Sequence, residues 1–271
     1  MKELIIVRGG GDLATGTIHK LYKCGFSVLV LEVEKPSAIR RNVAFSEAVY
    51  EGQHTVENVT CFLADSLSHA KSLLKEGKLT VLVDPKGSAI SELQPMAVVD
   101  AILAKKNLGT HKKMAPITVA LGPGFEAGVE VDAVIETNRG HNLGRVLWSG
   151  CAAPNTGIPG IIGGFGKERV LYSQAAGILK NVCKITDTVH KGDVIAEVET
   201  EEGSIPILAT LDGLLRGLLR DGYPVTKGFK IADIDPRLEE YENCFMISDK
   251  SRCIAGGVVE AIMQLKGERC L

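Results

Sequence analysis

Apolar residues in the first half of the chain fall into short runs that alternate with segments of helical spacing. Runs of four to seven mostly apolar residues, typical of buried parallel strands, occupy residues 4–7, 27–33, 60–63, 79–83 and 117–121. Apolar positions three or four residues apart predict helices over residues 12–21, 67–75 and 96–106. Strands that alternate with helices through short turns predict an α/β fold with a Rossmann-like doubly wound parallel sheet.

The pattern changes after residue 137, where glycines and short β segments replace the helical spacing. Residues 189–198 and 225–234 nearly repeat each other 36 residues apart, each with a Val-x-Lys-Gly turn followed by an alternating strand. This repeat is similar to the barrel-sandwich hybrid of biotinyl and lipoyl domains, which carry a modified lysine in a hairpin. The turn between the two copies, residues 201–204, has no lysine, so we expect a structural or docking module rather than a carrier.

A last segment, residues 251–265, again has apolar side chains at helical spacing. An amphipathic helix has to bury its apolar stripe, and we expect this one to pack back on the N-terminal sheet. The predicted domains are a Rossmann-like nucleotide- or cofactor-binding domain over 1–140, a glycine-rich loop with a barrel-sandwich-like β module over 141–246, and a C-terminal helix over 247–271.

Three consecutive glycines follow the first predicted strand, and Asp12 begins the helix after them. Gly9, Gly11 and Ala14 fit the dinucleotide pattern G-x-G-x-x-G/A. In that pattern backbone amides approach a phosphate, while the helix N-terminus supplies partial positive charge. The residues predicted to bind a cofactor at this turn are Gly9, Gly10, Gly11, Asp12 and Thr15.

Carboxylates follow two other predicted strands. Glu32 lies 21 residues beyond Gly11, where Rossmann domains place the carboxylate that binds a ribose hydroxyl, although it also fits a solvated strand end. Asp84 either faces the same crevice as a cofactor-binding residue or caps the turn before Pro85. The paired arginines at 40 and 41 either contact a phosphate or lie in solvent.

The polar, glycine-rich segment 138–166 is long for a loop inside a compact protein, and such loops are usually functional or disordered. Asn138, Arg139 and Arg145 are the predicted anion contacts, because two arginines can clamp a phosphate or carboxylate. His141 could donate a proton or lie at a surface turn, and Cys151 could act as a nucleophile. Catalytic residues are not assigned beyond these two candidates.

The charge and apolar content of the chain bear on its binding partners and its location. A formal charge of -2, with lysine and arginine spread along the chain, gives no basic patch for nucleic acid or for a membrane surface. No apolar run approaches the roughly 18 residues of a spanning helix, and no signal-peptide pattern precedes the first strand, so we expect a cytoplasmic protein.

Cysteine usage predicts reduced thiols, because the seven cysteines are dispersed and include no C-x-x-C pair. They are Cys24, Cys61, Cys151, Cys183, Cys244, Cys253 and Cys270. We therefore expect neither a disulfide framework nor a metal site. Homo-oligomerisation stays open at this stage.

Five motifs together resemble the YqeB family. They are residues 8–16 (RGGGDLATG), 44–52 (AFSEAVYEG), 136–145 (ETNRGHNLGR), 155–160 (NTGIPG) and 233–237 (DIDPR). The family comprises accessory proteins of the selenium-dependent molybdenum hydroxylase system, so the resemblance implies a role in maturing such an enzyme. The N-terminal half also resembles the Rossmann portion of XdhC maturation factors, which bind molybdenum cofactor and assist its sulfuration and insertion.

Molybdenum cofactor is a pterin phosphate, often a dinucleotide, and the resemblance implies that the glycine turn and residues 138–145 bind it or a nucleotide used in its modification. A client hydroxylase would be the partner, and Cys151 could carry a transient persulfide or selenide. Two alternatives stay open. One is an NAD(P)-dependent oxidoreductase with Glu32 on the ribose and His141 as acid, and the other is a non-catalytic docking scaffold.

Overall fold

The computed structural model describes residues 3–269, which form two compact units. Unit 1 comprises the described parts of Met1–Pro36, Ala44–Thr156 and Ile247–Leu271. Unit 2 comprises Ser37–Val43 and Gly157–Met246. The boundary expected at 140/141 thus falls inside unit 1, and the short segment before Ala44 is grouped with the β-rich part of the chain.

Unit 1 is built on a nine-stranded sheet in the order β10-β9-β7-β6-β1-β2-β5-β4-β3. The strands are β1 (Leu4–Arg8), β2 (Ser27–Glu32), β3 (Gln53–Val56), β4 (Val59–Ala64), β5 (Leu79–Val83), β6 (Ala97–Asp100), β7 (Ile117–Leu121), β9 (Ala133–Ile135) and β10 (Val146–Leu147). The seven central strands run parallel, while β3 and β10 pair antiparallel at the two edges. Two further short strands, β8 (Glu126–Ala127) and β11 (Gly150–Cys151), form a separate antiparallel pair.

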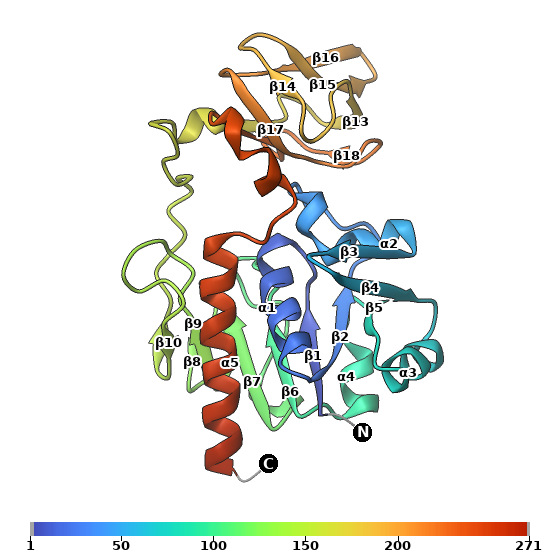
Figure 1. Ribbon diagram of the computed structural model, residues 1–271, viewed down its shortest axis with the longest axis vertical. Helices are drawn as coiled ribbons and strands as arrows, with labels where there is room; N and C mark the ends of the chain where they lie inside the picture. The colour runs from blue at the N-terminus through green and yellow to red at the C-terminus, as the bar shows by residue number, and fades with distance from the viewer. Residues whose placement is uncertain (1–2, 270–271) are drawn as a thin grey trace. The chain divides into compact units, whose positions relative to one another are not determined.

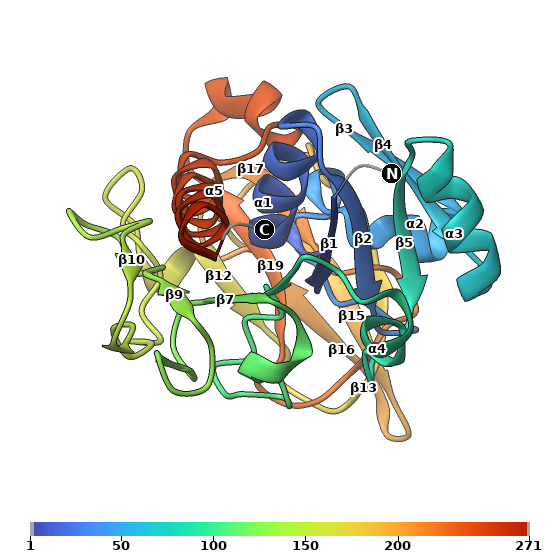
Figure 2. The same ribbon diagram turned by 90° about the horizontal axis from the view of Figure 1, so that it is seen from below.

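Helices cover both faces of this sheet (Figures 1 and 2). On one face α1 (Asp12–Lys23) lies beside α5 (Asp249–Arg269), and on the other lie α3 (Leu67–Lys75) and α4 (Ser88–Leu93). The short α2 (Ala48–Glu51) and two 3-10 turns, η2 (Phe45–Glu47) and η3 (Lys112–Met114), complete the unit. The central strands are apolar on both faces because both are buried under helices.

The predicted fold class, a Rossmann-like doubly wound sheet followed by a barrel-sandwich-like module, is wrong. In the large sheet β5 lies between β2 and β4, whereas the Rossmann order places the first three strands next to one another. The two edge strands, β3 and β10, are antiparallel to their neighbours. No α-helix lies between β6 and β7 along the chain. The chain is an α/β protein with a mostly parallel large sheet, several antiparallel sheets and a C-terminal helix.

The prediction of a helix over residues 96–106 is also wrong. The apolar residues Val98 and Val99 lie in strand β6, and a loop continues to η3. Within that loop Leu103 and Lys105 have φ angles of 58° and 62°, which an α-helix does not accommodate. A short apolar run followed by two more apolar residues fits a strand and a loop as well as it fits a helix.

Unit 2 consists of two four-stranded antiparallel sheets. One has the order β12-β19-β17-β14 and the other β16-β15-β13-β18. The strands are β12 (Val170–Tyr172), β13 (Gly177–Asn181), β14 (Thr188–Val189), β15 (Val194–Thr200), β16 (Gly203–Leu208), β17 (Gly213–Leu218), β18 (Pro224–Val225) and β19 (Lys230–Asp235). Three 3-10 helices accompany them: η1 (Arg41–Val43), η4 (Lys167–Arg169) and η5 (Leu238–Cys244).

The repeat seen in the sequence corresponds to the strand pairs β14–β15 and β18–β19. Each copy begins in one sheet of unit 2 and ends in the other, and the two copies cross in opposite directions, since β14 and β19 share one sheet and β15 and β18 share the other. Apolar side chains from both sheets, including Leu179, Ile195, Leu215 and Ile234, form the core between them.

A buried ion-pair network lies beside the core of unit 2. Arg169 donates to Asp233 Oδ1 at 2.9 Å and to the Ile234 carbonyl at 3.1 Å. Arg216 donates to Asp233 Oδ2, and Arg237 makes two bonds of 2.9 Å to Asp235. Burial alone would raise the pKa of Asp235, but the bonds from Arg237 and the charge of Arg216 outweigh it and hold that pKa below its ordinary value.

Candidate functional site

The three glycines after β1 have different reasons for being glycine. Gly9 has a φ of +92°, and a Cβ there would lie 2.9 Å from the Ala101 carbonyl oxygen. A Cβ at Gly10 would lie 3.0 Å from the Ser46 amide nitrogen. Gly11, the N-cap of α1, has a φ of -65°, and a Cβ there would meet no atom within 4 Å. Packing therefore explains the first two glycines, whereas the third faces open space.

Residues 45 and 46 hold the turn from the other side. Phe45 N–H donates to Thr15 Oγ1 at 2.9 Å, and Ser46 N–H donates to the Gly10 carbonyl at 2.8 Å. Thr15 Oγ1 in turn donates to the Gly11 carbonyl at 2.9 Å. Ser46 is 1% exposed, yet its Oγ has no hydrogen-bond partner within residues 3–269. A buried hydroxyl beside the turn therefore retains hydrogen-bonding capacity.

Glu32 lies at the same turn. Its Oε2 accepts the Gly10 N–H at 2.7 Å, and its Oε1 accepts the Val33 N–H at 2.8 Å. Burial raises the pKa of Glu32, and these two backbone bonds act in the opposite direction. The carboxylate thus fixes the turn, and its contact with a ribose hydroxyl stays a prediction.

Two other predicted contacts have structural roles. Asp84 Oδ2 accepts the Ala89 N–H at 2.8 Å, so the carboxylate caps the first turn of α4. Arg40 donates to the carbonyls of Asn243 and Met246, and Arg41 donates to the Leu218 carbonyl at 2.7 Å, all within unit 2. The arginine pair therefore anchors residues 37–43.

The N-termini of α1 and α5 lie side by side at the carboxyl end of the parallel strands (Figure 1). Ser251 Oγ donates to the Leu13 carbonyl at 2.9 Å and to the Asp12 carbonyl at 3.2 Å. A Cβ at Gly16 would lie 2.2 Å from Ser251 Oγ, so glycine permits this close approach. Two parallel helices thus direct their positive dipole ends to one region.

Lys250, in the first turn of α5, is half-buried in this region. Burial lowers its pKa, and the charge of Arg139 lowers it further, while Asp12, Glu136 and Asp249 act in the opposite direction. Within residues 3–269 its ammonium group forms no hydrogen bond and no ion pair. Lys250 is therefore a half-buried cation that three carboxylates stabilise through charge alone, without a hydrogen bond or ion pair in the described chain.

Two carboxylates near Lys250 already have partners. Asp249 forms an ion pair with Arg139, with N–O distances of 3.0 and 3.4 Å. Glu136 accepts the Asn138 N–H at 2.7 Å and the Ala153 N–H at 2.8 Å, which ties together two parts of the glycine-rich segment. We call Asp12, Glu136, Arg139, Asp249 and Lys250 the carboxyl-edge cluster.

The remaining candidates of the glycine-rich segment are exposed. His141 and Arg145 make no side-chain hydrogen bond or ion pair to any described residue, so both are available to a ligand. Cys151 is an exposed free thiol in β11, two residues before Ala153. Asn138 contributes its backbone to Glu136. His141, Arg145, Cys151 and Asn138 thus lie along one segment of the chain. Of the residues predicted to bind a cofactor, Asp12 and Arg139 belong to the carboxyl-edge cluster.

The thiols and carboxylates provide no metal centre within residues 3–269, where no group of three His, Cys, Asp or Glu side chains is arranged to hold an ion. Six cysteines in that range are free thiols, and burial raises the pKa of Cys61. Cys270 lies outside the described residues.

No helix in the described range has the length and apolar character needed to cross a bilayer.

Sequence reasoning missed Lys250 and Ser46. Ser46 lies within the AFSEAVYEG motif, and Lys250 lies at the start of a helix that was noticed for its apolar stripe. A lysine in the first turn of a helix opposes the helix dipole, and this unfavourable position was the available signal.

One relative matches nearly the whole chain. Over 263 residues, 97% of the chain, it is 53% identical to "Uncharacterized protein YqeB" of Escherichia coli (strain K12). This identity supports membership of the YqeB family. The chain spans 48% of that protein, about half the length of the curated relative it matches. No family model matches the chain.

Solved structures show weaker similarity. The ectoine utilization protein EutE (DoeB) of Ruegeria pomeroyi covers 86% of the chain, which covers 85% of it, at 12% identity and a TM-score of 0.27. An aspartoacylase family protein of Mesorhizobium loti covers 88% of the chain, which covers 86% of it, at 12% identity and a TM-score of 0.28. A succinylglutamate desuccinylase/aspartoacylase of Rhodobacter sphaeroides covers 87% of the chain, which covers 85% of it, at 10% identity and a TM-score of 0.28.

Proposed function

We propose that this chain takes part in the maturation of a selenium-dependent molybdenum hydroxylase, and that its glycine turn binds the phosphate end of molybdenum cofactor or of a related nucleotide. The pathway comes from the YqeB resemblance, and the client hydroxylase is the proposed partner. The binding mode is supported chiefly by one observation: Gly11 faces open space at the N-terminus of α1, and the N-terminus of α5, which carries Lys250, packs beside it through Ser251.

The residues at the turn fit a phosphate. The side chains of the carboxyl-edge cluster sum to one negative charge, and two helix N-termini add about one positive charge, so the region is close to neutral. Arg139 is already paired with Asp249, which leaves Lys250 as the cation that a phosphate can engage directly. The backbone at Gly11 can approach the ligand because no side chain or Cβ stands before it.

Each residue then has a definite task. Lys250 and the α1 N-terminus hold the phosphate, Ser46 Oγ offers a hydrogen bond from the buried side of the turn, and Glu32 keeps the Gly10 amide fixed. Arg145 is free to contact a second phosphate of a dinucleotide. When bound, the cofactor supplies the molybdenum centre, and this chain binds and orients it for delivery.

The test is native mass spectrometry of the protein purified from a host that makes molybdenum cofactor. We expect a retained pterin species in the unmodified protein and its loss in Gly11→Ala. A methyl group at Gly11 fits the backbone but intrudes on the ligand, at a cost of tenfold or more in affinity, or at least about 1.4 kcal/mol.

Gly267→Ala is the matched control, because Gly267 also faces open space but lies near the end of α5. It should retain the ligand like the unmodified protein. Repeated isolation with NAD(H), or with no ligand from a cofactor-producing host, would contradict the proposal. The first of these results would favour the oxidoreductase alternative, and the second the scaffold.

A further inference from the structure

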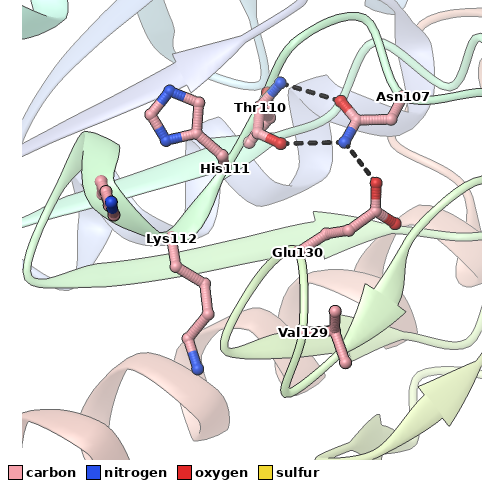
Figure 3. A pocket seen from close by; sticks show the side chains of 7 residues that line it. Asn107, Thr110, His111, Lys112, Val129 and Glu130 are labelled. Atoms are coloured by element: carbon pink, nitrogen blue, oxygen red, sulfur yellow. Dashed lines mark hydrogen bonds between the residues drawn. The ribbon is translucent and has the colours of Figure 1, made fainter.

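A cavity of unit 1 lies along the second half of the loop between β6 and β7, just after the segment that was expected to be a helix (Figure 3). Its volume is about 420 Å³. Five of its seven lining residues come from this loop and the start of η3, and the other two come from the turn between β8 and β9. They are Asn107, Thr110, His111, Lys112, Lys113, Val129 and Glu130.

The hydrogen-bond acceptors of this cavity are used within the protein. Asn107 Oδ1 accepts the N–H groups of Gly109 and Thr110, both at 2.8 Å. Glu130 Oε1 accepts from Asn107 Nδ2 at 2.8 Å, and its Oε2 accepts the Glu126 N–H at 2.9 Å. These bonds shape the wall that Figure 3 shows around Asn107 and Glu130, and they leave little acceptor capacity for a ligand.

The donors, in contrast, are available. The side chains of His111 and Lys113 form no hydrogen bond or ion pair with any described residue. Lys112 Nζ lies 3.4 Å from Asp132 Oδ1 and donates to the Gly128 carbonyl at 3.1 Å, which leaves one of its three N–H groups. Lys112 is balanced by Asp132 and Glu130 adds a negative charge to the wall, but the unused donors of His111 and Lys113 favour a ligand that brings acceptors and negative charge.

We infer that this cavity binds the anionic group of a small organic molecule, a carboxylate or a phosphate ester. His111 and Lys113 contact the anionic oxygens, and Lys112, which also lines the cavity, adds its charge. Val129, whose side chain is 63% exposed, offers an apolar surface to the hydrocarbon part of such a molecule. This site is separate from the glycine turn and does not depend on the proposed function.

Histidine NMR at constant ionic strength tests this inference, with inorganic phosphate and succinate as probes and sodium chloride as the reference. We expect the His111 resonance, assigned through His111→Gln, to shift saturably with at least one probe. The probe that saturates at the lower concentration distinguishes a phosphate site from a carboxylate site. A shift that is linear, or equal with chloride, would overturn the inference.

Lys113→Gln should weaken the saturable binding roughly fivefold, as expected for loss of one partly exposed charge contact. Lys105→Gln removes the same charge from the same loop outside the cavity and should leave the binding unchanged. Equal effects of the two substitutions would show a general charge effect and overturn the site. Lys250→Met should leave the His111 titration intact, which separates this cavity from the carboxyl-edge cluster.

Discussion

Unit 2 buries Arg169 in an ion pair with Asp233, whereas unit 1 leaves Lys250 half-buried without an ion pair in the described chain. The first arrangement satisfies both charges inside the fold. The second imposes a desolvation cost that nearby carboxylates offset in part and that an added anion would relieve further. We therefore expect the arginine network to serve stability, and the proposed function assigns Lys250 to binding. The difference predicts opposite effects of removing one charge from each region.

The largest effect is expected from Asp233→Ala. It removes the carboxylate that pairs with the buried Arg169 and the half-buried Arg216, which should cost about 3–5 kcal/mol of stability. Hydrogen exchange should show faster exchange in β17 and β19 while the strands of unit 1 keep their protection. Glu201→Ala, at an exposed turn, is the control and should change stability by less than about 0.5 kcal/mol. Equal protection in both variants would refute the stabilising role of the network.

A smaller loss is expected from Gly9→Ala. The positive φ and the 2.9 Å approach to Ala101 should together cost about 3 kcal/mol in denaturant unfolding. Gly11→Ala should cost below about 1 kcal/mol, because the change affects an N-cap with open space before it. If the two variants unfolded at the same denaturant concentration, the distinction between packing glycines and the open glycine would fail.

The smallest effect is a gain. Lys250→Met should raise the melting temperature on the order of 1 °C at pH 7, because it removes a half-buried charge. The folded pKa of Lys250 lies below its unfolded value, so the native state binds fewer protons between the two values. The stability of the unmodified protein should therefore rise with pH through that window.

Thermal unfolding from pH 7 to pH 11 measures this trend. The advantage of Lys250→Met should be complete below the folded pKa and disappear above the unfolded one. Lys71→Met, at an exposed position on α3, should show no such convergence. A loss of stability in Lys250→Met at pH 7 would mean that Lys250 stabilises the fold, and the contrast between the two regions would collapse.

Local patterns predicted much of unit 1. The apolar runs that form β1, β2, β5 and β7, and the helical spacing of α3, were recognisable because each element buries a continuous set of neighbours in sequence. The strand order was not predictable in this way. Insertion of β5 between β2 and β4 depends on which strand edges pair, and the apolar runs of these strands are alike.

The candidate site was predictable only in part. Gly9–Gly11 and Glu32 follow a known sequence spacing, so the glycine turn could be predicted. The structure shows the Glu32 carboxylate accepting a hydrogen bond from the Gly10 amide, a contact that the sequence did not predict. Lys250 and Asp12 are separated by most of the chain, and only the packing of Ser251 against α1 brings them together. The cavity beside Lys113 is lined by loop residues 107–113 and by Val129 and Glu130, and no pattern in the sequence relates these two segments.

The pairing of α1 with α5 also has a consequence for synthesis on the ribosome. Ile254, Val258 and Ile262 of α5 are fully buried within unit 1, and all of unit 2 is made before them. The face of the unit 1 sheet beside α1 therefore stays partly uncovered until α5 emerges. The carboxyl-edge cluster is completed at the same moment, because a nascent chain stalled before residue 249 would lack Asp249 and Lys250.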